Sequence, residues 1–291
     1  MPEEKEQSSD PIARVEPQSR AVVINRLRIG ERKTAIGIEP VAVESAEEYV
    51  VWWIFRVLKW EKVGQEQHVA FARSFGGIDV NRFFAAVPGY PMIAEVRKEP
   101  EQQRNIGNGW HTDHSYDEAP ALGSMLYARE VPRTGGDTLF ASMYAAYDAL
   151  SDGLKSTLEG LRALHSNRHV FGPAAAVRRG DLEGRIRNAE HATQDAVHPV
   201  VIRHPDTGRK ALYVNPGFTV RFEGWTEEES RPLLDYLYRH AVRPEFTCRF
   251  QWREGSLAFW DNRSTWHFAI NDYHGERRLL HRITIEGQKL S

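Results

Sequence analysis

The stretch GNGWHTDHSYDEAP, residues 107–120, brings two histidines and three acidic residues into a short span that also holds glycine, tryptophan and proline. An ordinary core avoids such groups, because a buried polar side chain without a partner costs free energy. Residues two positions apart in an extended strand point to the same side, so we expect His111 and Asp113 to project together and Thr112 to face away. One imidazole and one carboxylate need a third ligand before they can hold a metal ion.

The H-x-D/E pattern is weak on its own, because the chain also contains it at 204–206 (HPD) and 274–276 (HGE). Asp206 is better explained as a turn residue of a hairpin, and the other instance lies in a glycine-containing loop. On spacing alone, a surface His–Asp hydrogen bond is the commoner origin of such a motif. His267 is the candidate third ligand, because it follows an expected strand that ends at 260–262. Two histidines and one carboxylate would leave one side of the ion open and suit non-haem Fe(II).

A pair of arginines lies on the last expected strand, residues 278–286. Alternation along this strand puts Arg278 and Arg282 on one face and His281 on the other, which argues against His281 as the third ligand. Two arginines on one strand face are costly unless they meet anions. They lie about 13 Å apart at ~3.3 Å per residue, a spacing that can serve two separate anions near one centre. Salt bridges to neighbouring acids are the commoner fate of such arginines and stand as the alternative.

The overall composition is that of a globular protein with nearly balanced charge. The 291 residues include 38 Lys and Arg against 40 Asp and Glu, a formal charge of −2. This balance argues against binding to nucleic acid or an anionic membrane by charge alone, and no apolar run reaches the ~18 residues of a transmembrane helix. Cys248 is the single cysteine, which excludes a disulfide within the chain and a Cys-based zinc site. Because the polar N-terminus also lacks the apolar region of a signal peptide, the sequence indicates a cytoplasmic protein.

Hydrophobic patterning predicts many strands and few helices. Residues 1–20 are rich in Glu, Gln, Ser and Pro and are expected to form a disordered tail, followed by a single domain over 21–291. Thr226 with Glu229 forms a capping box at the start of the clearest helix, 226–241. Further helices are expected at 65–75, 142–149 and 151–160. Strands are expected from about residue 21 and at 122–130, 137–141, 195–204, 210–215, 246–252, 256–261 and 278–286. Residues 45–61 fit either type. The pattern favours one mainly β domain built on a barrel or a double sheet.

Several motifs follow one another over about residues 64–287. They are WHTD (110–113), TGGDT (134–138) and WDNR-x-x-x-H (260–267), with an arginine eleven and another fifteen residues after that histidine, and the fragments HPVVIRHPDTGRKALYVN (198–215) and PEFTCRFQW (244–252). Each motif alone is weak, but together and in this order they make the sequence resemble the TauD/TfdA family of Fe(II)- and 2-oxoglutarate-dependent dioxygenases. The resemblance implies a double-stranded β-helix, a jelly-roll barrel of the clavaminate synthase-like type with flanking helices.

The resemblance also implies roles for the candidate residues of the metal and cosubstrate sites. His111, Asp113 and His267 would bind Fe(II) and would be the catalytic residues. Thr138 and Arg278 would bind the distal carboxylate of 2-oxoglutarate, whose keto acid end would chelate the metal. O₂ would be the second cosubstrate, and the reaction would yield succinate and CO₂ while a hydroxyl group is added to the primary substrate.

In this resemblance, Arg282 would face the acidic group of a small organic substrate. Taurine-specific members hold the sulfonate with a His and a Tyr in the loop after the first long helix, where this sequence has Asn81 and Phe84, and an Asn shortly before the metal motif is replaced by Gly107. These differences argue against taurine. The candidate substrate-binding residues are Arg282, Asn81, Phe84, His114, Phe171 and Phe218. Such a lining fits an aryloxyalkanoate-like, aromatic or branched carboxylate, although phenylalanines more often belong to a core and a histidine such as His114 is about as often solvated.

Other functions are compatible with the same residues. Within the family, a sulfonate or an alkyl sulfate is the alternative substrate, and a product hydroxylated at a carbon that bears an ether, ester or sulfonate group would fragment. A non-redox ligand-binding protein on the same barrel is a second alternative, and a metal hydrolase, with Asp137, Asp261 or His281 as the base beside metal-bound water, is a third. A nucleic-acid oxygenase is disfavoured because the sequence shows no clear basic surface interleaved with aromatic residues. A homo-oligomer is expected because relatives are often dimers or tetramers.

Overall fold

The computed structural model describes residues 38–40, 54–57, 64–177 and 185–290. These residues belong to one compact unit of the chain, Thr34–Ser291. The tail expected at 1–20, the strand expected from about residue 21 and most of the ambiguous segment 45–61 lie outside the described residues. The domain boundary expected near residue 20 therefore stays a prediction.

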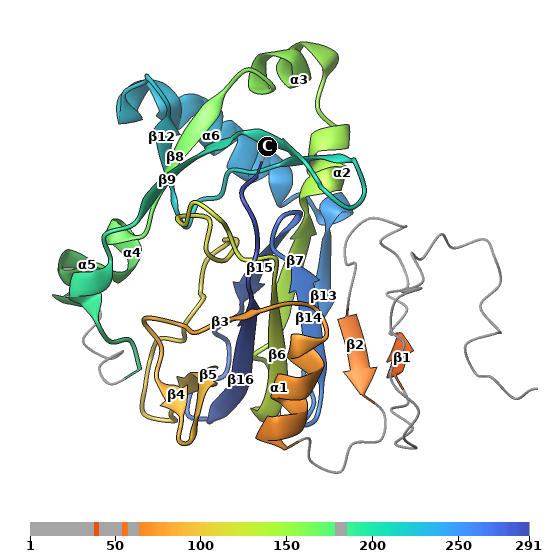
Figure 1. Cartoon of the computed structure of the whole chain (residues 1–291), viewed down its shortest axis with the longest axis vertical. Coiled ribbons are helices and arrows are strands. Elements are labelled where there is room, and N and C mark those ends of the chain that lie inside the picture. Colours follow the sequence, from red (N-terminus) through yellow and green to blue (C-terminus); the bar gives the residue numbers. More distant parts are fainter. Residues whose placement is uncertain (1–37, 41–53, 58–63, 178–184, 291) are drawn as a thin grey trace, which may run out of the picture. The chain divides into compact units, whose positions relative to one another are not determined.

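Two antiparallel sheets supply most of the described strands (Figure 1). The larger sheet has the order β1-β2-β14-β6-β16-β5-β4, with β3 paired to β16. Its strands are β1 (Ile38–Pro40), β2 (Ile54–Val57), β3 (Ile78–Asp79), β4 (Ala86–Val87), β5 (Tyr90–Lys98), β6 (Gly123–Glu130), β14 (Leu257–Asp261) and β16 (Arg278–Ile285). The second sheet has the order β13-β7-β15 and consists of β7 (Thr138–Ser142), β13 (Thr247–Phe250) and β15 (Thr265–Ala269). In the larger sheet, Arg282 of β16 lies between Ala94 of β5 and Leu126 of β6.

Two small sheets and several helices flank these strands. The small sheets are β12-β8-β9, formed by β8 (Arg162–Ser166), β9 (Asp195–Pro199) and β12 (Thr219–Phe222), and the pair β10 (Val201–Arg203) with β11 (Lys210–Leu212). The helices are α1 (Gln65–Arg73), α2 (Met143–Asp148), α3 (Asp152–Leu158), α4 (Arg168–Phe171), α5 (Pro173–Val177) and α6 (Glu227–Ala241), with 3-10 turns at Ala189–His191 and Pro244–Phe246. Helix α1 lies against the larger sheet, whereas α2 contacts β11 and α6 contacts β12 (Figure 1). Among the helices described, none combines the length and the apolar character that a membrane span requires.

The expected helices are confirmed to within a few residues. At α6, Thr226 Oγ1 accepts a hydrogen bond from the Glu229 N–H at 3.2 Å, and the Glu229 carboxylate accepts one from the Thr226 N–H at 2.8 Å, so the capping box forms as expected. The expected hairpin over 195–215 is only partly right, because β10 and β11 pair while β9 pairs with β8 in another sheet. The patterning missed β1, β3, β4, β5, β8, β12 and β15, and all of these except β5 are short strands whose stability comes from pairing rather than from their own composition.

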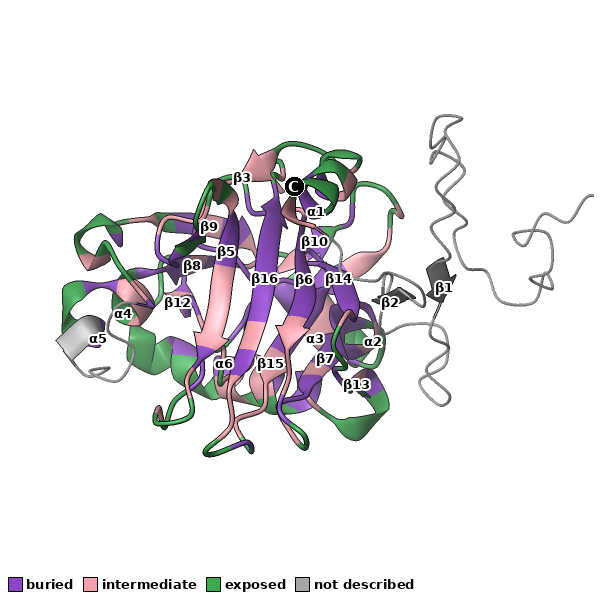
Figure 2. Ribbon diagram, turned by 90° about the horizontal axis from the view of Figure 1, so that it is seen from below, coloured by how far each residue is buried: buried purple, intermediate pink, exposed green. Residues whose placement is uncertain are grey.

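The facing sides of the two main sheets pack on each other through one cluster of buried side chains. It includes Leu126 of β6, Phe140 of β7, Trp260 of β14 and Leu280 of β16. A second cluster covers the opposite side of the larger sheet, where α1 contributes Val69 and other apolar residues. The middle strands β16, β6 and β14 are therefore mostly buried, as their purple colour in Figure 2 shows. The expected mainly β architecture with flanking helices is confirmed.

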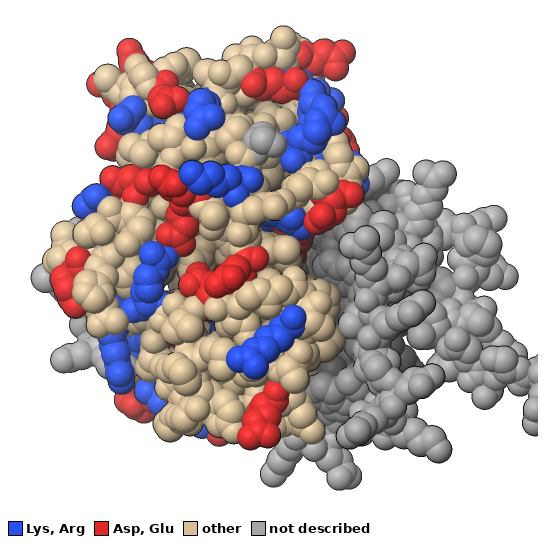
Figure 3. All heavy atoms as spheres, in the orientation of Figure 1, with Lys and Arg blue, Asp and Glu red and all other residues tan. Residues whose placement is uncertain are grey.

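Surface charge is mixed on the face that Figure 3 shows. Lysine and arginine side chains lie interspersed with aspartate and glutamate over the whole face. A protein that attracts a polyanion usually presents a broad field of one sign instead. This face therefore has the balanced charge that the formal value of −2 predicts.

Candidate active site

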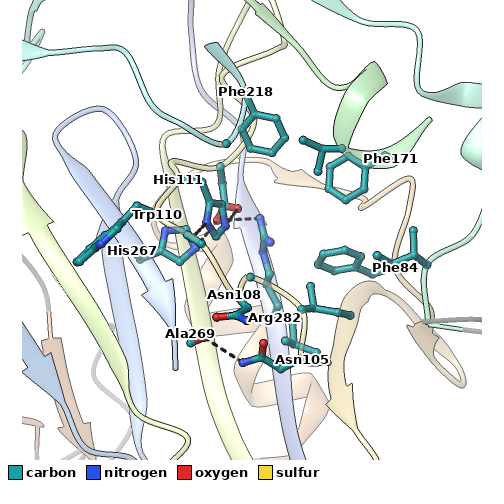
Figure 4. A pocket seen from close by; sticks show the side chains of 18 of the residues that line it. Phe84, Asn105, Asn108, Trp110, His111, Phe171, Phe218, His267, Ala269 and Arg282 are labelled. Atoms are coloured by element: carbon teal, nitrogen blue, oxygen red, sulfur yellow. Dashed lines mark hydrogen bonds and ion pairs between the residues drawn. The ribbon is translucent and has the colours of Figure 1, made fainter. Parts of the chain in front are cut away.

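The three candidate metal ligands converge at one point of the fold, although His267 is far from the other two in sequence. Ligand atoms of His111, Asp113 and His267 all lie within 4.8 Å of one another. Each histidine Nε2 lies 3.7 Å from an oxygen of the Asp113 carboxylate. Figure 4 shows the two imidazoles side by side at one wall of a pocket. Two imidazoles and one carboxylate in this arrangement can hold a single ion from one side and leave its other side open.

A backbone pairing aligns the two imidazoles. The His111 N–H donates to the His267 carbonyl at 3.1 Å, and the His267 N–H donates back at 2.8 Å. Because the two residues face each other in register, their rings project to the same side, with centroids 4.1 Å apart. His267 lies inside β15 rather than after a strand, which the sequence did not reveal. The expected strand through the HTD motif is wrong beyond His111, because the chain enters a turn at Asp113. The turn nevertheless brings the carboxylate to the same side.

Further contacts hold the ligands in place. His111 Nδ1 lies 2.8 Å from the Gly109 carbonyl, which must accept a hydrogen from it, so that the Nε2 lone pair is left for a metal. Asp113 Oδ2 accepts a hydrogen bond from Ser124 Oγ at 2.6 Å and forms an ion pair with Arg282 Nη2 at 2.9 Å. Asn262 Nδ2 donates to the same Ser124 oxygen at 3.1 Å. The ligand set is therefore oriented by the protein itself.

Burial and neighbouring charges give the three ligands the protonation states that metal binding needs. Burial lowers the pKa of both His111 and His267, so the two imidazoles are neutral at pH 7. Burial alone would raise the pKa of the Asp113 carboxyl, but the Arg282 guanidinium holds that pKa below its usual range. Neutral imidazoles and an ionised carboxylate are the ligand forms that bind a divalent cation.

Arg278 is a buried cation with unused hydrogen-bond donors. The residue is 2% exposed, and its Nε and Nη2 have no hydrogen-bond partner among the described residues. Trp252 lies under the guanidinium, with the ring centroid 5.7 Å from Cζ. Thr138 Oγ1 accepts a hydrogen bond from Trp252 Nε1 at 2.9 Å, which leaves the threonine hydroxyl hydrogen available for an acceptor. Because a buried cation with two unused N–H donors is costly, an anionic ligand is the expected partner of these donors.

The TGGDT motif makes room for Arg278. Gly136 has φ +69°, and a Cβ at this position would lie 3.2 Å from Arg278 Cδ and 2.9 Å from Pro132 Cγ. A larger residue would therefore be strained by its backbone and would press on the arginine. Gly136 and Thr138 of the motif therefore both shape the anion site at Arg278.

Arg282 departs from the sequence expectation in part. The resemblance implies that Arg282 faces the acid group of a substrate, and its Nη2 already pairs with Asp113, as the salt-bridge alternative predicts. Its Nε has no hydrogen-bond partner among the described residues, and its Cζ lies 5.6 Å from the centre of the Phe84 ring. Arg282 therefore joins the metal ligands to the aromatic part of the pocket.

A cavity of about 630 Å³ contains every candidate site residue. Its lining includes His111, Asp113, His267, Thr138, Arg278, Arg282, Asn81, Phe84, His114, Phe171 and Phe218. Other lining residues were not identified from the sequence, among them Asn105 and Asn108, labelled in Figure 4. Asn105 Nδ2 donates to the carbonyls of Ala269 and Ile270 at the end of β15, at 3.0 and 3.2 Å. The run NIGNG just before the WHTD motif was the only sequence signal for these two asparagines.

Aromatic side chains form one wall of this cavity. Phe83 stacks on Phe171 with centroids 4.5 Å apart, and Tyr116 meets Phe218 edge to face at 4.9 Å. The alternative that these rings are merely core holds for Phe83, which is 1% exposed and does not line the cavity. Phe84, Phe171 and Phe218 line it.

Asn81 shapes the loop that carries Phe84. The Asn81 side-chain oxygen accepts hydrogen bonds from the N–H groups of Phe83 and Phe84, at 2.9 and 2.8 Å. This oxygen is therefore committed to the backbone, and Asn81 can meet a ligand only through its amide nitrogen.

A family model described as "Taurine catabolism dioxygenase TauD, TfdA family" matches residues 54–284. The chain belongs to the TauD/TfdA family. It is 37% identical over 230 residues to an alkylsulfatase of Acinetobacter baylyi, a match that covers 78% of this chain and 71% of the relative. It is 36% identical over 247 residues to an α-ketoglutarate-dependent 2,4-dichlorophenoxyacetate dioxygenase of Cupriavidus pinatubonensis, covering 78% and 83% of the two chains. The solved structure of AAD-2 in complex with Mn(II) and N-oxalylglycine has 31% identity and a TM-score of 0.61, with 79% and 81% covered.

Membership of the TauD/TfdA family confirms the expected class of enzyme. The protein is a 2-oxoglutarate-dependent dioxygenase with Fe(II) as its metal and O₂ as the second cosubstrate. The residues present fit these groups, because three converging ligands suit the metal and a buried guanidinium with two unused N–H donors suits a carboxylate.

The candidate bases of a hydrolase have structural partners instead. Asp137 pairs with Arg249 at 2.6 Å, Asp261 pairs with His204 at 3.0 Å, and His281 Nδ1 accepts a hydrogen bond from Arg129. None of these three candidates is among the residues that line the cavity described above. The non-redox alternatives therefore lack support from both family and site.

Proposed function

We propose that this TauD/TfdA dioxygenase hydroxylates a small organic acid with an aryl or branched apolar body. One observation carries the proposal: a single cavity holds the three converging ligands, Arg278 with its two unused N–H donors and an aromatic wall beside Arg282. In this assignment His111, Asp113 and His267 bind Fe(II). The bound iron would supply the redox chemistry by which O₂ and 2-oxoglutarate oxidise a substrate C–H bond, giving succinate, CO₂ and a hydroxylated product.

The role of Arg278 and Thr138 is to bind the distal carboxylate of 2-oxoglutarate. A guanidinium offers two parallel N–H donors to a carboxylate, and the threonine hydroxyl adds a directional hydrogen bond. Burial against Trp252 fixes the plane of the arginine and keeps water away from it. The keto acid end of the cosubstrate is then directed toward the metal ligands.

The role of Arg282 is to orient the acid group of the primary substrate. Phe84, Phe171 and Phe218 would surround the apolar body and exclude water from the carbon that reacts. Asn81 and His114 belong to the same part of the lining. An aryloxyalkanoate would fit this arrangement, and its product would fragment because the hydroxylated carbon bears an ether oxygen.

An alkyl sulfate or a sulfonate is the second candidate substrate. The 37% identity to an alkylsulfatase favours it, and a guanidinium binds a sulfate group as readily as a carboxylate. Oxidation of the carbon next to the sulfate ester oxygen would release sulfate. The aromatic wall is the feature that favours an aryl-bearing acid over a simple alkyl chain.

We further propose that the two main sheets form a double-stranded β-helix, supported by the shared cluster that includes Phe140 and Leu280. A cytoplasmic location is part of the same proposal, supported by the single cysteine. The homo-oligomer stays a prediction.

A substrate panel tests the proposed function. Purified protein would be supplied with Fe(II), 2-oxoglutarate, O₂ and one of four classes of acid: aryloxyacetates, aryloxypropionates, alkyl sulfates and sulfonates. Succinate formation that rises at least tenfold with an aryloxy acid, and that stops without O₂, would support the main proposal. A response confined to alkyl sulfates or sulfonates would favour the second candidate, and succinate formation that no acid stimulates would contradict both.

A further inference from the structure

His114 has an unusual backbone and a deeply buried side chain. It follows the candidate ligand Asp113 and has φ +58°, a left-handed conformation that residues other than glycine rarely adopt. Among the described residues, Asn188 is the other non-glycine residue with a positive φ. The His114 side chain is 3% exposed. A buried side chain on a strained backbone indicates that this side chain has a specific role.

Two carboxylates hold one edge of the His114 ring. Nδ1 lies 3.1 Å from Asp79 Oδ2 and 3.0 Å from Asp117 Oδ2. Because both partners are acceptors, Nδ1 must carry a hydrogen. Arg82 Nη2 in turn donates to both oxygens of Asp117, at 2.8 and 2.7 Å. Because Arg82 already pairs with the Asp117 carboxylate, this carboxylate is not free to bind a second metal ion. The contacts with Asp79 and Asp117 instead hold the His114 ring in place.

The other nitrogen of His114 has no partner within the described part of the protein. Nε2 is buried and makes no hydrogen bond to any described residue. The Nδ1 edge faces the acids of a separate outer pocket of about 360 Å³, whereas His114 itself lines the large cavity. Its ring also packs on Tyr116, another lining residue, with centroids 5.5 Å apart. Buried polar atoms are almost always hydrogen-bonded, and this one belongs to a residue on the lining of the cavity in which a ligand would lie.

We propose that His114 is a specificity-determining residue that selects acids carrying a second hydrogen-bonding group away from the acid group. This inference rests on the proposed function and adds to it the chemical class of the substrate: an organic acid with a hydroxyl or an amide N–H on its apolar body, which can donate to Nε2. Arg282 takes the acid, the phenylalanine wall takes the apolar body, and His114 Nε2 meets the second polar group. A site built around a hydrogen bond rejects the analogue that lacks it, because its own polar atom is left unpaired.

Matched pairs of substrates and two variants test this role. The pairs are 4-hydroxyphenoxyacetate with 4-methylphenoxyacetate, and 6-hydroxyhexyl sulfate with heptyl sulfate, which differ in one polar group at similar size. His114→Asn tolerates the left-handed backbone and keeps an amide near Nδ1, but removes the atom in the place of Nε2. His114→Gln reaches the place of Nε2 and gives up the contact with the acids.

The expected readout is the ratio of the two kcat/KM values within a pair. The wild type should prefer the hydroxy member of at least one pair by about tenfold, the size of one good hydrogen bond. In His114→Asn this ratio should fall to about one, mainly through a higher KM for the hydroxy member, while His114→Gln should keep part of the preference.

Three outcomes would overturn the inference. The first is a wild type that turns over both members of each pair equally well. The second is a His114→Asn variant whose KM rises equally for both members, since that result would mean that His114 only supports the loop. Either result would leave the proposed function intact, because succinate is still formed. The third is no succinate from any of the four compounds, which would refute the proposed function together with this inference.

Discussion

Arg282 and Asp113 form an ion pair inside the candidate active site, with Nη2 2.9 Å from Oδ2. The same arginine lies beside the Phe84 ring at the wall of the substrate cavity. The charge of the carboxylate ligand is therefore balanced before any substrate enters. In the proposed binding mode, an acidic substrate would share this guanidinium with Asp113 rather than meet an unpaired cation.

Replacing Arg282 should weaken the binding of the primary substrate more than that of the cosubstrate. We expect Arg282→Gln to raise the KM for the acid substrate by about 10- to 100-fold, because a charge-assisted hydrogen bond contributes about 1.5–3 kcal/mol. The KM for the cosubstrate should change by less than about threefold, since Arg278 is the residue proposed to bind that molecule. Initial rates of succinate formation with each compound varied in turn provide the measurement, and an equal rise in both KM values would contradict the division of roles.

The corresponding variant at Arg278 should raise the KM for the cosubstrate more than the KM for the primary substrate. Arg278→Gln removes the buried guanidinium whose Nε and Nη2 have no partner among the described residues. The KM for the cosubstrate should rise by about 10- to 100-fold while the KM for the primary substrate stays nearly constant. Because the variant also removes a buried charge with two unused N–H donors, its thermal unfolding without cosubstrate should occur at the same or a higher temperature. A lower unfolding temperature would show that Arg278 has an internal partner.

Gly217 lies against a metal ligand, and an added methyl group should disturb it. A Cβ at this position would lie 2.6 Å from His111 Cβ, closer than two carbon atoms can approach. We expect Gly217→Ala to displace His111 and to weaken metal binding at least tenfold, because the ligand must keep its orientation. Anaerobic titration with Mn(II), followed by the rise in unfolding temperature, would measure this loss.

A second glycine provides the matched control for that experiment. Gly153 in α3 has no atom within 4 Å of an added Cβ. Gly153→Ala should therefore leave Mn(II) binding unchanged and stabilise the helix by about 0.5–1 kcal/mol. If both variants lost Mn(II) affinity to the same extent, the clash with His111 could not be the cause.

His68 should make the protein less stable in mild acid. Burial, with smaller contributions from His281 and Arg129, lowers the pKa of His68 from 6.5 to about 3, and neither of its ring nitrogens has a hydrogen-bond partner among the described residues. Below pH 6.5 the unfolded chain takes up a proton that the folded protein refuses, so stability falls as the pH drops from 6.5 toward 3. At pH 5 the loss from this group is about 2 kcal/mol.

The variant His68→Leu should remove this part of the pH dependence. Urea unfolding at pH 7.5 and pH 5 would compare the two proteins, and the loss of stability between these values should be about 2 kcal/mol smaller in the variant. Parallel losses in both proteins would mean that His68 is protonated in the folded state.

The sequence predicted the candidate site better than it predicted the elements that build it. Every candidate residue lines one cavity. The order of several motifs identified these residues, and strand alternation correctly placed Arg278 and Arg282 on one face. By contrast, β15 was missed although it carries His267. A strand of five residues forms because β7 pairs with it, and its own composition does not reveal that partner.

Contacts between distant segments account for the other differences. The turn at Asp113 and the ion pair of this residue with Arg282 depend on how two segments far apart in the chain meet. The cluster of Asp79, His114 and Asp117 has the same origin, since Asp79 is remote from the HTD motif. The periodicity of a segment carries no information about its contacts with distant segments, so the sequence did not predict these contacts.

The proposed role of Arg278 would make the cosubstrate part of the charge balance of the folded protein. If Arg278 binds the cosubstrate as proposed, the two unused N–H donors of this buried cation would gain a partner, and the enzyme would gain stability from the same molecule that it consumes. Its lifetime against heat or proteases would then follow the supply of 2-oxoglutarate, so that the abundance of the enzyme and the carbon status of its surroundings would be tied together without any dedicated regulator.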